Sequence, residues 1–132
     1  MTRREQREHI FKLLFFVEFY EEEELSEQQQ FYIEEELAEV SEKDKAYILE
    51  KYRKIREKLP EIDELLEGVS KGWKRTRMGK VELALMRLAV YEIKFDEDIP
   101  VGVAINEAVE LAKKFGGDGA PAFINGILAK LV

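Results

Sequence analysis

The sequence predicts an all-α protein of about seven helices, and three observations carry this prediction. Apolar residues recur with the helical period along most of the 132-residue chain, and no segment alternates apolar and polar residues as a half-buried strand does. Capping-box and proline signals mark the beginnings of successive short helices. The chain is long enough to bury a core without disulfides, so we expect a single domain over residues 1–132.

The N-terminal half, about 1–71, is expected to contain four helices. An amphipathic first helix is predicted over about 3–20, because its apolar residues lie close to one stripe. A second helix is expected to open at Ser26, because Gln29 stands three residues later and completes a capping box.

Ser41 followed by Asp44 predicts the start of a third helix in the same way. Pro60 ends that helix, since proline keeps the preceding residue out of α geometry, and it also suits the first turn of a fourth helix. The stretch 71–79 interrupts the helical pattern. We expect the boundary between the two halves there, with the second half covering about 72–132.

The C-terminal half is predicted to contain three helices, over about 78–95, from Pro100 and from near Pro121. The first of these is apolar on nearly every side, which predicts the most buried helix of this half or a helix that lies against a partner. Some apolar side chains of this helix point away from its main stripe. They are either buried in the core or form a protein-binding patch, and they are Leu83, Met86 and Val90.

The last helix contains the pair Asn125-Gly126, which is typical of two-residue hairpin turns. The apolar residues around the pair keep the helical period, and too few residues follow for a paired strand, so we interpret the segment as a helix. A glycine inside a helix costs about 1 kcal/mol relative to alanine. Tight packing against another helix is one explanation for Gly126, and a ligand surface beside an outward-facing Asn125 is the other.

Composition excludes several classes of function. The chain has no cysteine, which excludes disulfides, thiolate metal sites and a cysteine nucleophile. His9 is the single histidine, so zinc-protease, di-iron and serine-triad sites lack the residues they require. No glycine-rich phosphate loop occurs. We therefore expect no enzyme, no metal and no cofactor. Neither a long apolar run nor a signal-peptide pattern occurs, which predicts a cytoplasmic protein without membrane contact.

The net charge of −7 argues against a general polyanion binder, but the charge is unevenly distributed. Residues 18–50 hold thirteen acidic side chains against two lysines. Basic side chains, which bind RNA by neutralising phosphates, gather at two other places. By themselves, both are either solvated or part of a binding surface. They are the N-terminal arginines, Arg3, Arg4 and Arg7, and the cations of the connecting stretch, Lys71, Lys74, Arg75 and Arg77.

Three stretches of the C-terminal half carry a resemblance to a known family. They are GWKRTRMGKVELALMRLAVYE from Gly72, IPVGVAINEAVELAKKFG from Ile99 and FINGIL from Phe123. In this order and spacing they resemble the bacterial transcription antitermination factor family NusB, and the N-terminal arginines before an apolar helix are similar too. The resemblance implies seven helices in two three-helix-like halves. It also implies binding of boxA-like single-stranded RNA together with the ribosomal protein NusE, in the antitermination complex of RNA polymerase.

Carried over by position, the resemblance implies an RNA surface on the first, fifth and last helices. By its place in the apolar stripe alone, Phe123 is more typical of core than of base stacking. Ala120 and Ala129 depart from the family pattern, which commonly has a serine and an aspartate at these positions. The implied RNA-binding residues are Arg3, Arg4, Arg7, Lys80, Glu82, Phe123 and Asn125.

Two alternatives to this function stay open. The acidic first half is compatible with a protein-interaction module that has little RNA affinity, and a homodimer is compatible with the same apolar surfaces. A third alternative, the accessory domain of an RNA methyltransferase, requires a cofactor-binding domain for which 132 residues leave no room.

Overall fold

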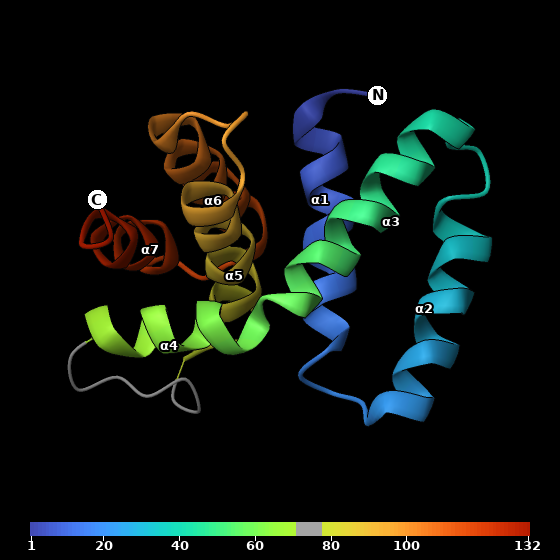
Figure 1. The fold of residues 1–132 in the computed structure, drawn as a ribbon, viewed down its shortest axis with the longest axis horizontal. Coiled ribbons are helices and arrows are strands. Elements are labelled where there is room, and N and C mark those ends of the chain that lie inside the picture. The colour runs from blue at the N-terminus through green and yellow to red at the C-terminus, as the bar shows by residue number, and fades with distance from the viewer. Residues whose placement is uncertain (71–77) are drawn as a thin grey trace. The chain divides into compact units, whose positions relative to one another are not determined.

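The computed structural model describes residues 1–70 and 78–132. Within these ranges the chain forms seven α-helices and no strand, which confirms the all-α prediction (Figure 1). The helices are α1 (Arg3–Phe16), α2 (Glu22–Glu36), α3 (Glu42–Glu57), α4 (Leu59–Val69), α5 (Lys80–Phe95), α6 (Val101–Phe115) and α7 (Ala120–Ala129).

The chain forms two compact units, Met1–Lys54 and Ile55–Val132, which divide within α3. The second unit includes α4, because this helix packs against α5. The sequence instead predicts halves of about 1–71 and 72–132. That boundary stays a prediction, because residues 71–77 lie outside the described part of the chain.

The first unit packs α1 against α2 around a buried apolar core that includes Leu14, which is fully buried. Polar contacts link its helices as well. Nδ1 of His9 on α1 lies 2.7 Å from the hydroxyl of Tyr32 on α2, and the two rings meet edge to face. The Gln29 amide of α2 donates to the Tyr52 hydroxyl of α3.

Of the two helix starts predicted from these serine patterns, one is confirmed and one is wrong. Ser41 does cap α3, because its Oγ accepts a hydrogen bond from the Asp44 N–H at 3.2 Å. Ser26 does not begin α2, which already starts at Glu22 without a side-chain cap. The acidic side chains in the first turn of α2 stabilise its N-terminus through the helix dipole, so the earlier start is favourable. α1 ends at Phe16, earlier than predicted.

The second unit is built around α5, which contacts α4, α6 and α7. Ten consecutive residues of α5, Leu83–Glu92, are buried, in agreement with the prediction of a helix that is apolar on nearly every side. Leu83, Met86 and Val90 are at most 1 % exposed, as the core alternative for these side chains predicts.

A buried ion pair joins α4 to α5. The Arg87 guanidinium donates two hydrogen bonds to the Asp63 carboxylate, Nε to Oδ1 and Nη2 to Oδ2, both at 2.9 Å. Arg87 is 3 % and Asp63 7 % exposed. Such a bidentate ion pair forms only at a restricted set of angles and distances. It therefore fixes the orientation of α4 on α5 in addition to holding the two helices together.

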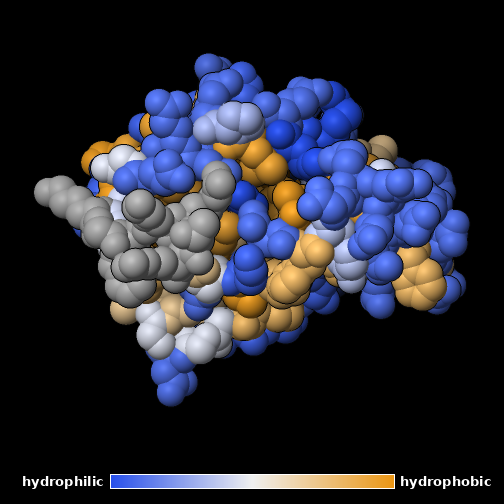
Figure 2. All heavy atoms as spheres, turned by 90° about the horizontal axis from the view of Figure 1, so that it is seen from below, coloured by the Kyte–Doolittle hydropathy of each residue, from blue (hydrophilic) through white to orange (hydrophobic). Residues whose placement is uncertain are grey.

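Hydrophilic residues cover much of the face seen in Figure 2, and apolar residues show between them. Among the described residues, no helix combines the length and the apolar character that a bilayer span requires.

Candidate nucleic-acid interface

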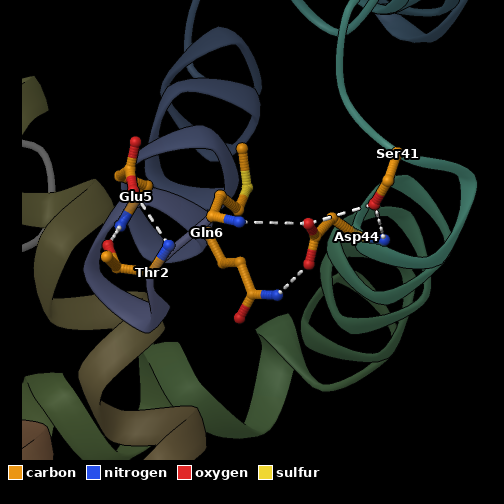
Figure 3. Close-up of polar contacts among 6 residues, drawn as sticks. Thr2, Glu5, Gln6, Ser41 and Asp44 are labelled. Atoms are coloured by element: carbon orange, nitrogen blue, oxygen red, sulfur yellow. Dashed lines mark hydrogen bonds and ion pairs between the residues drawn. The ribbon is translucent and has the colours of Figure 1, made fainter.

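The start of α1, which carries the N-terminal arginines, is held by a complete capping box (Figure 3). The Glu5 N–H donates to Thr2 Oγ1 at 3.1 Å, and the Thr2 N–H donates back to Glu5 Oε1 at 2.8 Å. These two bonds satisfy backbone donors that the first turn of a helix leaves without partners. The chain therefore enters α1 in a defined direction.

Asp44 ties this helix start to α3 (Figure 3). Its carboxylate accepts hydrogen bonds from the Gln6 amide at 2.8 Å and from Ser41 Oγ at 3.1 Å, and lies 3.4 Å from the N-terminal ammonium. Desolvation of the carboxyl opposes ionisation, but these hydrogen bonds and the ammonium outweigh it and lower the pKa of Asp44 below its ordinary value. Asp44 is thus an ionised anchor for the first residues of the chain.

The three N-terminal arginines differ in their exposure. Arg3 and Arg4 are exposed in the first turn of α1, and the Arg3 guanidinium lies 5.7 Å from the centre of the Tyr47 ring. Arg7, one turn later, is only 6 % exposed. Arg3 and Arg4 are therefore the cations of this cluster that solvent reaches, and an RNA contact of Arg7 stays a prediction.

In the second unit, the start of α5 and the start of α7 share a pocket of about 280 Å³. Glu82 and Phe123, far apart in the sequence, both line it, which brings together two of the residues predicted for RNA binding. Lys80 is exposed in the first turn of the same α5. We call this the α5–α7 pocket; its lining consists of Met78, Gly79, Glu82, Gly117, Gly119, Ala120 and Phe123.

The outer side of α7 continues beside this pocket. Asn125 and Gly126 are both exposed, whereas Ile124 is buried. A Cβ added to Gly126 would meet nothing within 4 Å, so the explanation of this glycine by tight helix packing is wrong. Phe123 is neither buried nor fully exposed, and it lines the pocket.

Two departures from the family pattern also have a place in the structure. Ala120 is buried in the lining of the α5–α7 pocket, and Ala129 is exposed near the end of α7. The basic side chains predicted in the connecting stretch, Lys71, Lys74, Arg75 and Arg77, lie outside the described residues.

Sequence reasoning did not assign the glycines of the α5–α7 pocket to a binding site. Gly79, Gly117 and Gly119 stand next to helix ends, where glycine is common for reasons of backbone conformation. Their shared role as a pocket lining depends on α7 lying beside the start of α5. The one local signal is Gly79 three residues before Glu82, a spacing that resembles a capping box.

A comparison with known families places the fold. The sequence profile of the NusB family matches residues 4–132. The chain belongs to the NusB family. The transcription antitermination protein NusB of Lachnoclostridium phytofermentans is 54% identical over 132 residues, which is 100% of this chain and 99% of that protein. The protein of the same name from Acetivibrio thermocellus is 44% identical over 132 residues. The match spans 100% of this chain and 89% of that protein.

Solved structures agree with the NusB assignment. The T. maritima NusB structure is 35% identical, superposes with a TM-score of 0.83, and the match covers 99% of this chain and 90% of that one. A chain from a structure described as "Crystal Structure of a Plectonemic RNA Supercoil" is 26% identical with a TM-score of 0.81, over 98% of this chain and 94% of that one. The resemblance to NusB and the seven-helix fold are thus confirmed.

Proposed function

We propose that this NusB-family chain is a non-enzymatic, cytoplasmic RNA-binding factor. In this proposal it recognises boxA-like single-stranded RNA together with the ribosomal protein NusE, and acts in the antitermination complex of RNA polymerase. The observation that carries the proposal is the α5–α7 pocket, because Glu82 and Phe123 line it together and the exposed Asn125 stands on the same helix as Phe123.

The chemistry of these groups suits unpaired nucleotides. An accessible aromatic ring stacks on a base, and a carboxylate or an amide forms hydrogen bonds with base edges. Phe123 supplies the ring, and Glu82 and Asn125 supply the polar groups. Arg3 and Arg4, exposed at the capped start of α1, supply charge for phosphates.

The absence of catalysis in this proposal is supported by the surroundings of the single histidine. His9 is packed against Tyr32 on α2, and burial, followed by the charge of Lys12, lowers the pKa of His9. Among the described residues, no group of three or more His, Cys, Asp or Glu side chains could hold a metal ion.

The proposal is tested by titrating a labelled boxA-like oligoribonucleotide with the protein, alone and with NusE, at several salt concentrations. We expect affinity to fall with salt with a log–log slope of about −0.7 for each phosphate contact, and to exceed that for a scrambled oligonucleotide. Equal affinity for the two RNAs would contradict specific recognition of the boxA-like sequence. Binding of NusE without any RNA affinity would favour the protein-interaction module.

A homodimer is tested separately by sedimentation of the protein with and without NusE. A monomer that forms a 1:1 complex supports the proposal as stated. A stable homodimer that NusE does not dissociate would contradict it.

A further inference from the structure

The N-cap of α5 is occupied by Gly79, and the Glu82 carboxyl group lies where a side chain at position 79 would stand. A Cβ built on Gly79 would collide with Glu82 Oε2 and would lie 2.9 Å from Glu82 Cδ. Gly79 has φ −62° and ψ 147°, an extended conformation that other residues adopt readily. The backbone here therefore accepts a larger residue, but its Cβ would displace the Glu82 carboxyl group, which is the far end of a flexible side chain.

The same two residues line the α5–α7 pocket, and Phe123 of α7 completes it. With a volume of about 280 Å³, the pocket is slightly smaller than the range of roughly 300–1,000 Å³ for small-molecule sites, which suits one flat base better than a larger ligand. The Glu82 carboxyl group therefore helps to define the pocket, and the missing side chain of Gly79 leaves the space that this carboxyl group occupies.

We propose that Gly79 is a positioning residue for the recognition of one base. In this inference, which rests on the proposed function, the missing side chain lets the Glu82 carboxylate fold over the start of α5 and face the α5–α7 pocket. There it accepts hydrogen bonds from a guanine that stacks on Phe123.

The preference for guanine follows from the arrangement of donors. An ionised carboxylate only accepts hydrogen bonds, and its two oxygens bind two parallel N–H groups well. Guanine presents N1–H and the N2 amino group side by side. Adenine and cytosine place an acceptor nitrogen next to their amino group, and uracil places its N–H between two carbonyl oxygens, so these edges put an acceptor against the carboxylate.

A purely structural role for Gly79 predicts a different result. If Glu82 served only to cap the first turn of α5, moving its side chain would change stability but not the choice among bases. The readout is therefore a ratio of affinities. The probes are a boxA-like oligoribonucleotide that contains guanosine and the same oligonucleotide with inosine, which lacks the N2 amino group, in its place.

The test compares Gly79→Ala with Gly119→Ala. Gly119 lines the same pocket, but a Cβ there meets nothing within 4 Å, so it is a matched control for adding a methyl group. We expect the wild-type protein and Gly119→Ala to bind the inosine RNA about tenfold more weakly than the guanosine RNA, the loss typical of a hydrogen bond to a charged group. In Gly79→Ala this ratio falls to about twofold or less, because the Glu82 carboxyl group is displaced.

Glu82→Gln provides a second variant, which keeps the length of the side chain and removes its charge, and is expected to lower the ratio as well. Thermal unfolding establishes that each variant is folded. A Gly79→Ala protein that keeps the full ratio overturns the inference, and so does a Gly119→Ala protein that loses it. Wild-type protein that binds RNA without any inosine penalty refutes this inference alone, whereas wild-type protein without RNA affinity refutes the proposed function.

Discussion

Asp63 and Arg87 are two residues whose role becomes visible only when their helices are placed together. Each is a charged side chain in an amphipathic or apolar helix, and periodicity gives no reason to pair them. In the structure they form a buried bidentate ion pair, with both N···O distances at 2.9 Å. Breaking such a pair leaves a buried charge without its main counterion, which is expensive.

We expect Asp63→Ala to lower the free energy of unfolding by about 3–5 kcal/mol. Urea denaturation measures the loss. Lys113→Ala is the control, because Lys113 and Glu110 form an exposed pair on α6 at 2.7 Å, and its removal should cost less than about 1 kcal/mol. Similar losses in the two variants would show that the buried pair contributes nothing beyond a surface one.

His9 makes stability depend on pH. Burial is the largest cause that lowers its pKa below the ordinary value of 6.5, and Lys12 lowers it further, while Glu8, Glu36 and Glu5 oppose the change. The folded protein therefore binds this proton more weakly than the unfolded chain. It follows that stability has its full value above about pH 6.5 and falls as the pH decreases from there toward the lower pKa of the folded state.

We expect His9→Gln to flatten this part of the stability profile, since glutamine has no proton to bind. The measurement is the free energy of unfolding in urea between about pH 5 and pH 8, the range in which histidines titrate. An unchanged slope in His9→Gln would assign the pH dependence to other groups.

At the scale of elements, the two serine patterns that predict helix starts have different outcomes. Ser41 caps α3, and Thr2 caps α1 in a reciprocal arrangement with Glu5. Ser26 has the same local spacing but lies inside α2, because nothing in the preceding acidic turn prevents an earlier start. The same short pattern thus predicts a start in one place and not in another.

Loss of the α1 cap is expected to destabilise the protein and loosen the N-terminal arginines. Thr2→Ala should cost about 1 kcal/mol of unfolding free energy, within the range for helix caps, while Thr2→Ser should retain most of the cap. Thermal unfolding measures both. If the two substitutions behave alike, the hydroxyl group of Thr2 is not what stabilises the helix start.

Substitution of Gly116 and of Gly126 by alanine is expected to change the unfolding free energy in opposite directions. A Cβ on Gly116, the C-cap of α6, would lie 2.6 Å from Ala120 Cβ and 2.9 Å from the Ala112 carbonyl oxygen, whereas Gly126 has open space. We expect Gly116→Ala to lower the unfolding free energy by about 1–3 kcal/mol, as overpacking does. Gly126→Ala should raise it by about 0.5–1 kcal/mol, because alanine is the better helix former. Thermal unfolding of the two variants measures both changes. A destabilised Gly126→Ala protein would contradict the finding that a Cβ at Gly126 has free space around it.

At the scale of the whole molecule, the residues proposed for RNA binding are divided between the two compact units. Arg3 and Arg4 belong to the first unit, and Glu82 and Phe123 belong to the second. If one RNA contacts both, a phosphate contact and a stacking contact should respond independently to mutation.

We expect Arg4→Ala to weaken boxA-like RNA binding and to reduce the salt slope by about 0.7. Phe123→Ala should cost about 1–3 kcal/mol of binding free energy without changing the slope, and the double variant should show the sum. Lys12→Ala is the control for charge, since Lys12 pairs with Glu8 on the same helix. A double variant that binds no more weakly than Phe123→Ala would exclude Arg4 from the RNA surface.

Much of the fold was predictable because it depends on neighbours in the sequence. Helical periodicity predicted the seven helices, and Pro60, which stands in the first turn of α4, predicted the junction between α3 and α4. The candidate site was less predictable. Glu82 and Phe123 were named only through the family resemblance, and no local pattern indicates that they line one pocket.

The sequence by itself determined the all-α class, the order of the helices and membership of the NusB family, because periodicity, caps and motifs act over a few residues. Only the tertiary structure decided that Arg7 is buried, that Gly126 has open space and that Asp63 binds Arg87. Each of these depends on which distant residues come into contact. Such contacts are set by the packing of whole helices, which the order of residues along one helix does not reveal.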